Sequence, residues 1–264
     1  MLKTDTGRGR VSKHSEILSL GAILVILVLL FSLALPGKFL RPSNLQSMAF
    51  QLPELGVLAF AMMITMLTGG INLSIISSAN LSGIIMAMIL TGDLASGPGG
   101  AGLGWTIFLA VLAGLSISLL VGLVNGMIIA YIGVSPILAT LGTMTLLEGI
   151  SLVITRGYVI SGLPRELLVI GNGTFLGVPV PMFILVAVAV GVAIILNKTR
   201  LGLSTYMIGS NIKATSFSGI NTNKVTILVY MISGLLAGIA SLIMIARFNS
   251  AKAGYGSSYL LVTV

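Results

Sequence analysis

The chain contains no cysteine and only one histidine, His14, which lies in a polar N-terminal tail. Without thiols, the protein can form neither a disulfide framework nor a thiolate metal site. A single histidine in that tail also excludes a Ser/His/Asp triad or a histidine metal site inside a membrane. Charged residues are scarce as well. They make up 8% of the 264 residues, whereas about 25% is usual in soluble domains.

Apolar residues are what the chain has in excess. They form 56% of the sequence, and the mean hydropathy is +1.12. A globular core cannot bury so much apolar surface, so the remainder must face lipid. We therefore predict an all-α fold, a polytopic transmembrane helical bundle.

Uncharged runs set the number of crossings, because one crossing needs about 20 residues. The first run, Ile17–Leu35, is longer than the apolar core of a signal peptide, about 7–15 residues, and it lacks a small-x-small cleavage site. We interpret it as a retained first helix. Four further runs follow, and the first two are each long enough for two crossings: Leu55–Gly92, Leu94–Leu147, Leu167–Asn197 and Val225–Ala246. The prediction is about seven crossings or broken crossings.

The net charge of +8 is unevenly distributed. Eight basic residues fall in two clusters, one at the N-terminus and one in a later polar segment: Lys3, Arg8, Arg10, Lys13, Lys198, Arg200, Lys213 and Lys224. This distribution follows the positive-inside rule and does not favour nucleic acid as a partner. It predicts a multi-pass protein in a lipid bilayer with its N-terminus and both clusters in the cytoplasm.

We divide the chain into a cytoplasmic tail, residues 1–16, and a transmembrane domain, residues 17–264. The domain contains a polar cytoplasmic segment at residues 197–224. The last apolar run, Tyr259–Val264, is too short to cross a bilayer. We expect the transmembrane domain to continue beyond Val264.

The segment 197–224 has the signals of a short helix. Ser210 or Asn211 can cap its start, and Ser218-Gly219 can end it. Ile208, Ile212 and Phe217 give it an apolar side. Either a protein partner or the lipid headgroups must cover that side.

Two stretches are candidates for a transport pathway. In Thr68–Ser82, the adjacent Gly69 and Gly70 interrupt an apolar run, and Asn and Ser side chains follow. A helix broken at membrane depth must bond other protein groups or line a water-filled cavity, as beside transporter pathways. A tight turn packed through small residues is the alternative.

The second stretch is Ser135–Thr145. Pro136 suits a first helical turn. The small, polar residues that follow it, Thr140, Gly142, Thr143 and Thr145, favour close helix packing.

Two acidic residues lie in or beside apolar runs. Glu54 follows Pro53, and we interpret it as an interfacial cap where the helix dipole favours negative charge. Glu148 lies inside a predicted crossing, where a carboxylate is either functional or paired with Arg156 or Arg247. The Gly-rich loop at Gly97–Gly100 lacks the Gly-Lys-Ser/Thr ending of a Walker A sequence.

Five stretches, in their order and spacing, resemble one known family: Leu67–Ser74, Leu141–Thr145, Ile160–Pro164, Gly209–Asn221 and Ser233–Gly238. The chain is similar to the membrane permease subunits of bacterial ATP-binding cassette importers for monosaccharides, the ribose-type group. The resemblance covers roughly Ile17–Val264. It implies a non-catalytic transport subunit of the bacterial inner membrane.

The resemblance also implies partners. These are a second permease subunit, in a homodimer or heterodimer, two cytoplasmic ATPase subunits or one tandem ATPase, and a periplasmic or lipid-anchored solute-binding protein. ATP and magnesium would be bound by the ATPase, so this chain is expected to bind no cofactor and no metal and to have no catalytic residue. An ion-coupled secondary transporter is the weaker alternative, since only Glu148 qualifies as a coupling acid.

The candidate residues fall in two groups. For the translocation pathway we expect Gly69, Gly70, Asn72, Ser74, Asn80, Thr140, Gly142 and Thr143. For coupling to the ATPase the resemblance implies Asn211, Lys213, Ala214, Ser218, Gly219, Ile220 and Asn221. The family commonly has Asp at the position of Asn72 and often a basic residue at that of Glu148. The solute therefore stays open among monosaccharides, nucleosides, branched-chain amino acids and a furanosyl signalling molecule.

Overall fold

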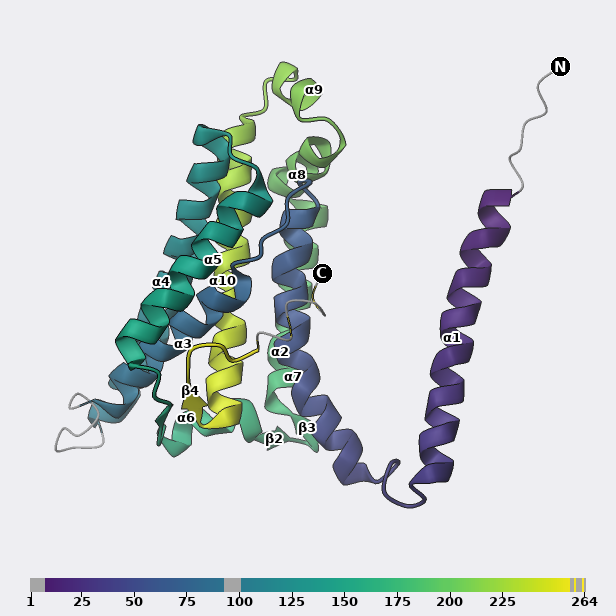
Figure 1. Cartoon of the computed structure of the whole chain (residues 1–264), viewed down its shortest axis with the longest axis vertical. Helices are drawn as coiled ribbons and strands as arrows, with labels where there is room; N and C mark the ends of the chain where they lie inside the picture. Colours follow the sequence, from purple (N-terminus) through teal and green to yellow (C-terminus); the bar gives the residue numbers. More distant parts are fainter. Residues whose placement is uncertain (1–7, 93–100, 257–258, 260–262, 264) are drawn as a thin grey trace. The chain divides into compact units, whose positions relative to one another are not determined.

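The computed structural model describes residues 8–92, 101–256, 259 and 263. The loop at Gly97–Gly100 and the start of the N-terminal tail lie outside these residues. The chain divides into two compact units, Met1–Met48 and Ala49–Val264. The all-α prediction is confirmed, because the strands in the described part are four segments of two residues each (Figure 1).

The first unit is built around α1 (Arg8–Ala34). The predicted helix at Ile17–Leu35 is therefore present, and it starts earlier than its apolar run. A turn follows in which Gly37 has φ +71°, a conformation that glycine adopts without steric cost. Phe31 and Phe39 stack across this turn with ring centroids 5.6 Å apart.

The second unit contains the remaining helices, together with the strands and a π-helical turn, η2. The bounds are α2 (Pro42–Met66, which begins in the first unit), α3 (Ile75–Thr91), α4 (Ala101–Met127), η2 (Ile128–Ile132), α5 (Pro136–Thr155), β1 (Ile160–Ser161), α6 (Arg165–Asn172), β2 (Thr174–Phe175), β3 (Val178–Pro179), α7 (Val180–Lys198), α8 (Arg200–Ser210), α9 (Ile212–Phe217), α10 (Thr222–Phe248) and β4 (Ser250–Ala251). We call the two ends of this unit the α9 end and the α6 end, after the helices at the top and bottom of Figure 1.

Seven apolar helices match the predicted crossings. Five are long and apolar enough to cross a membrane: α2, α4 with η2, α5, α7 and α10. Two shorter apolar helices, Leu18–Ala34 and Ile75–Thr91, complete the set within the described residues. Their composition and number make this a multi-pass membrane protein.

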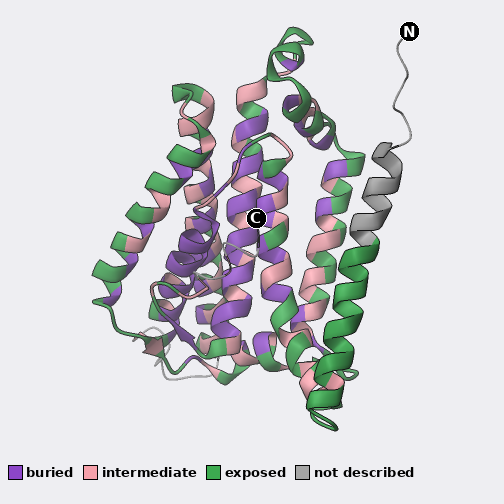
Figure 2. Ribbon diagram, turned by 45° about the vertical axis from the view of Figure 1, so that its right-hand side comes forward, coloured by how far each residue is buried: buried purple, intermediate pink, exposed green. Residues whose placement is uncertain are grey.

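Helices α3 and α10 lie innermost in the second unit. Figure 2 shows buried residues on most sides of both, while α5 and α7 are largely exposed. One apolar cluster joins α2, α3 and α10 through residues such as Leu58, Ile75 and Leu236. A second cluster lies toward the α6 end, where Leu167 of α6 meets Leu90 and Ile245. The exposed outer helices are the ones that lipid must cover.

Small residues allow α4 and α10 to approach each other closely. A Cβ atom at Gly122 would overlap the backbone at Tyr230, and one at Gly234 would overlap the carbonyl of Ser118. Gly238 likewise packs against the Ser118 side chain. Small residues four apart are a usual device for packing helices in membranes. The motif Ser233–Gly238 therefore serves this contact.

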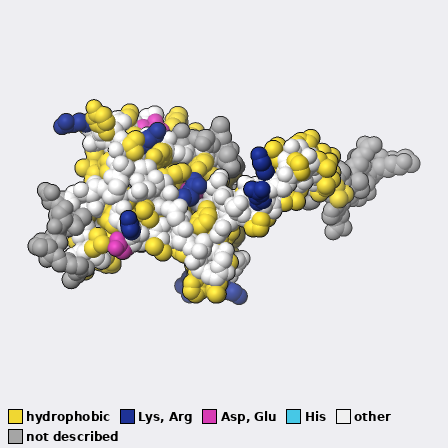
Figure 3. Space-filling model, turned by 90° about the horizontal axis from the view of Figure 1, so that it is seen from below, with side chains coloured by type: hydrophobic (Ala, Val, Ile, Leu, Met, Phe, Trp, Pro, Cys, Tyr) yellow, Lys and Arg dark blue, Asp and Glu magenta, His cyan; other side chains and the backbone are white. Residues whose placement is uncertain are grey.

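The α6 end carries most of the irregular structure. The connection between α5 and α7 contains α6 and three short strands, which were not predicted. Strand β1 pairs antiparallel with β4, with Ile160 opposite Ala251, and β2 pairs with β3. Figure 3, which looks onto this end, shows scattered basic side chains, some beside acidic ones, among hydrophobic and other side chains.

Candidate functional site

The chain between α2 and α3 re-enters the helical unit from the α9 end. Helix α2 ends at Met66, and α3 begins only at Ile75. In the connection, Gly69 has φ +81°. Asn72 Nδ2 donates to Ser233 Oγ of α10 at 3.0 Å, and Ser233 lies eleven residues into α10, or about 16 Å along the helix. The predicted glycine break is therefore a break at depth and not a turn at the surface.

Side chains satisfy the backbone that this break frees. The Leu73 amide donates to Thr140 Oγ1 at 3.1 Å, and Thr140 Oγ1 is also 3.1 Å from the carbonyl of Ile71. The Ser74 amide donates to Asn72 Oδ1 at 3.2 Å. In a membrane, freed backbone groups must find such partners inside the protein. Thr140 of α5 thus holds the break from one side and Asn72 from within.

A buried polar network extends from the break into two neighbouring helices. Ser74 Oγ donates to Asn72 Oδ1 at 2.8 Å and accepts from Asn125 Nδ2 at 2.8 Å. Thr143 Oγ1 of α5 in turn donates to Asn125 Oδ1 at 2.6 Å. Asn72, Ser74 and Asn125 are each at most 2% exposed. The network therefore ties the start of α3 to α4, α5 and α10.

Gly70 lies where α5 and α10 converge on the break. A Cβ there would overlap the Tyr230 hydroxyl and lie tightly against the ring of Pro136. Tyr230 is 1% exposed, and its hydroxyl has no hydrogen-bond partner among the described residues. An unpaired polar group thus lies directly against the glycine that the break requires.

The predicted pathway residues separate into three groups. Gly70, Asn72, Ser74, Thr140 and Thr143 lie together around the break. Gly69 and Gly142 are exposed, with no atom near enough to contact an added Cβ. Asn80 lies further along α3, in a different cavity beside Ser241, Lys252 and Tyr255. Their role in transport remains a prediction.

Asn125, Ser233 and Tyr230 were missed as site residues. Asn125 is the central member of the network, yet it lies in the uncharged run Leu94–Leu147. A polar side chain inside an apolar run was the available signal, since such residues are rare and often functional in membranes.

The segment 197–224 folds as two short helices at the α9 end. Asn211 Oδ1 accepts from the Ala214 amide at 3.0 Å, so Asn211 caps α9 as predicted. Ser218 follows the last residue of α9, and Gly219 has φ +79°. The other predicted coupling residues are also at the surface: Lys213, Ala214 and Asn221 are exposed and Ile220 is half-buried.

The exposure of Phe217 fits the predicted apolar side of this segment, whereas a contact of Gly209 was not foreseen. Phe217, the last residue of α9, is 93% exposed, although it is a large apolar side chain. Gly209 of α8 lies so close to the break that a Cβ would overlap the carbonyl of Leu67. Helix α8 therefore contacts the start of the break directly, while α9 presents Phe217 to the surroundings.

The interpretation of Glu54 as an interfacial cap is wrong. Helix α2 begins at Pro42, so Glu54 lies well inside the helix, and it is fully buried. Arg247 Nε and Nη2 donate to its two carboxylate oxygens at 3.0 Å and 2.6 Å, and Tyr259 Oη donates at 2.7 Å. Arg247 therefore pairs with Glu54 and not with Glu148, which forms no ion pair with any described residue.

We next compared the sequence with known protein families and solved structures. Residues 44–264 match the family described as branched-chain amino acid transport system / permease component. The chain belongs to this family. No solved structure matches it.

Several relatives in the family are longer than this chain. The chain is 37% identical to the ribose import permease protein RbsC of Bacillus subtilis over 240 residues, which is 90% of this chain and 71% of that protein. It is 35% identical to RbsC of Escherichia coli K12 over 265 residues, or 98% of this chain and 78% of that protein. It is 26% identical to the autoinducer 2 import system permease protein LsrD of Salmonella typhi, over 96% of this chain and 74% of that protein.

Proposed function

We propose that this permease is the membrane subunit of an ATP-binding cassette importer that moves a monosaccharide, ribose or a related sugar, across the bacterial inner membrane. The N-terminus would be cytoplasmic. The chain would form a homodimer or heterodimer with a second permease. It would receive solute from a periplasmic or lipid-anchored binding protein. Two ATPase subunits, or one tandem ATPase, would hold ATP and magnesium, and this chain would bind no cofactor.

The proposal rests mainly on the α8–α9 segment, on its exposed surface and on its contact with the broken helix. Its exposed surface combines basic residues with large apolar or aromatic side chains, namely Leu203, Tyr206, Ile212 and Phe217. Such a surface suits docking to a protein on the cytoplasmic side. Through Gly209 the segment also touches Leu67, at the start of the break. Movement of a docked ATPase would then reach the broken helix without any nucleotide site in this chain.

In an alternating-access mechanism, the break network would hold α3 in one of two positions. Asn72, Ser74 and Asn125 hold α3 against three other helices. Exchanging these hydrogen bonds for others would let α3 tilt and open the opposite side. A secondary transporter would instead need an intramembrane coupling acid. Glu54 is neutralised by Arg247, which leaves Glu148 as the candidate within the described helices.

The proposal is tested in proteoliposomes that contain the permease, its ATPase and its binding protein. We expect uptake of radiolabelled D-ribose that requires ATP and stops when the ATPase is omitted. Uptake driven by a proton or sodium gradient without ATP would overturn the proposal. ATP-dependent uptake of a nucleoside, a branched-chain amino acid or autoinducer 2 instead of ribose would overturn the proposed solute.

A further inference from the structure

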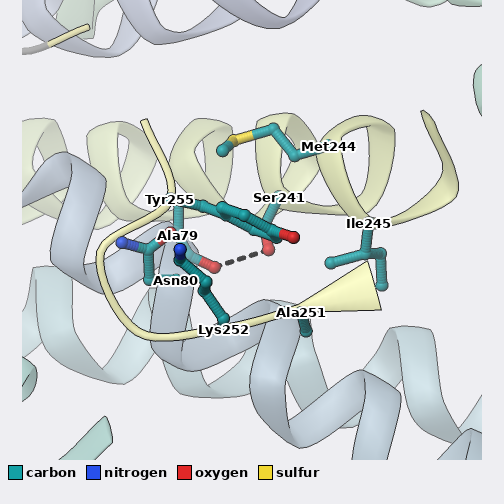
Figure 4. Close-up of a pocket in the computed structure, with 9 residues that line it drawn as sticks. Ala79, Asn80, Ser241, Met244, Ile245, Ala251, Lys252 and Tyr255 are labelled. Atoms are coloured by element: carbon teal, nitrogen blue, oxygen red, sulfur yellow. Dashed lines mark hydrogen bonds between the residues drawn. The ribbon is translucent and has the colours of Figure 1, made fainter. Parts of the chain in front are cut away.

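A small cavity lies between α3, α10 and the segment that follows β4. Its lining includes Asn80 of α3, Ser241 of α10, and Lys252 and Tyr255 of the last segment (Figure 4). The cavity measures about 10 Å³, close to the space that one water molecule occupies. It is separate from the break network, which lies nearer the α9 end.

Asn80 brings an unused amide to this cavity. The residue is 8% exposed, and its side chain forms no hydrogen bond with any described residue. Buried side-chain amides are normally paired, as Asn72 and Asn125 are here. An asparagine amide offers two donors and an acceptor, so Asn80 presents both kinds of group to whatever enters.

Lys252 indicates that the cavity borders water. Ser241, beside it, precedes the end of α10 by seven residues, which is about 10 Å of helix. Asn80 precedes the end of α3 by eleven residues, or about 16 Å. Lys252 is nevertheless exposed. Because Lys252 lines the same cavity, its ammonium group is expected to face water or protein there and not lipid.

Tyr255 adds an aromatic surface whose position is fixed. Its hydroxyl lies 2.7 Å from Ser250 Oγ, and its ring centroid lies 5.4 Å from Lys252 Nζ. Ser241 Oγ, which also lines the cavity, donates a hydrogen bond to the Ala79 carbonyl (Figure 4). The hydroxyl of Ser241 is therefore left as an acceptor only.

The geometry points to a solute-binding subsite formed by Asn80, Lys252 and Tyr255, selective for a polyhydroxylated, sugar-type molecule. The amide of Asn80 pairs with neighbouring hydroxyl groups, Lys252 donates to a third oxygen, and the Tyr255 ring covers the apolar C–H face of the solute. A few placed polar groups beside an aromatic wall are typical of small-molecule sites. In the conformation observed the subsite has room for a single water or hydroxyl, so it must widen during transport. This inference rests on the proposed function.

The absence of cysteine from the chain makes the test direct. Single variants Lys252→Cys and Val190→Cys are prepared in the complete importer and treated with a charged, water-soluble thiol reagent. Val190, on the exposed side of α7, is the control that lipid covers. We expect Cys at 252 to react quickly and millimolar D-ribose to slow that reaction several-fold, whereas leucine at equal concentration has no effect. Cys at 190 should react slowly whichever solute is present.

A second variant tests the amide itself. Asn80→Leu keeps the branched shape of the side chain, though it is larger, and removes every hydrogen-bonding atom, so ribose uptake should fall about tenfold while the ATPase stays bound. Arg165→Met, an exposed basic residue at the same end, should leave uptake unchanged. If the wild-type importer takes up ribose but ribose does not protect Cys at 252, or Asn80→Leu transports normally, the subsite is refuted and the proposed function stands. If the wild type takes up no ribose, the proposed function itself fails.

Discussion

Arg247, at the end of α10, forms a bidentate ion pair with Glu54, in the interior of α2. The two residues are 193 positions apart in the sequence, and Glu54 is completely buried. The pair therefore fixes α2 against the α6 end of α10, and Tyr259 adds a third hydrogen bond to the same carboxylate.

Breaking this pair from one side should destabilise the protein strongly. Glu54→Gln leaves the Arg247 guanidinium largely buried without its counter-charge, and such changes cost about 3–5 kcal/mol. The double variant Glu54→Gln/Arg247→Met removes both charges and should recover at least half of that loss. Thermal unfolding of the purified permease in detergent measures both effects. A double variant no more stable than Glu54→Gln alone would contradict this account.

The break network should be sensitive to the loss of one amide. Asn72→Leu removes the bonds to Ser233 and to Ser74, and it leaves buried hydroxyl and amide groups unpaired. We expect a loss of about 2–4 kcal/mol in stability and a large fall in uptake. Ser233→Ala removes only one of these bonds and should cost about 1 kcal/mol. Equal effects of the two substitutions in thermal unfolding would show that Asn72 does not organise the break.

The sequence predicted the features of this fold that depend on neighbouring residues, but not the side-chain contacts between residues far apart in the chain. Uncharged runs predicted the crossings, Gly69-Gly70 predicted the break, and Asn211 predicted the start of α9, because each depends on neighbouring residues. Glu54 was misplaced because its partner lies 193 residues away. Asn125 was missed for the same reason: nothing beside it in the sequence shows that Ser74 and Thr143 converge on it.

Phe217 is expected to anchor the ATPase. It is 93% exposed, and Phe217→Ala removes its ring without changing the backbone. We expect at least a tenfold weaker association of ATPase and permease, measured by co-purification and by transport-linked ATP hydrolysis, since a buried aromatic anchor is worth about 2 kcal/mol or more. Phe175→Ala, an exposed aromatic of β2 at the opposite end, is the matched control. Unchanged ATPase binding in Phe217→Ala would exclude this anchor and leave the lipid headgroups as the surface that covers Phe217.

Gly209 is expected to transmit movement from α8 to the break. Gly209→Val would push α8 away from the carbonyl of Leu67, so ATP hydrolysis should continue while uptake per ATP falls several-fold. Gly191→Ala in α7, where an added Cβ meets no atom within 4 Å, should leave that ratio unchanged. Normal uptake per ATP in Gly209→Val would exclude this contact from the coupling route.

Substitution of Tyr230 should test whether the break has a second conformation besides the one observed. Its hydroxyl is buried against Gly70 without a partner among the described residues, and an unpaired buried polar group costs about 1–3 kcal/mol. Tyr230→Phe removes that cost and should raise the stability of this conformation by about 1 kcal/mol in thermal unfolding. If the hydroxyl gains a partner when the break rearranges, the same substitution must also slow uptake, because it favours one state over the other. A variant that is more stable and transports at the wild-type rate would show that Tyr230 has no part in the rearrangement.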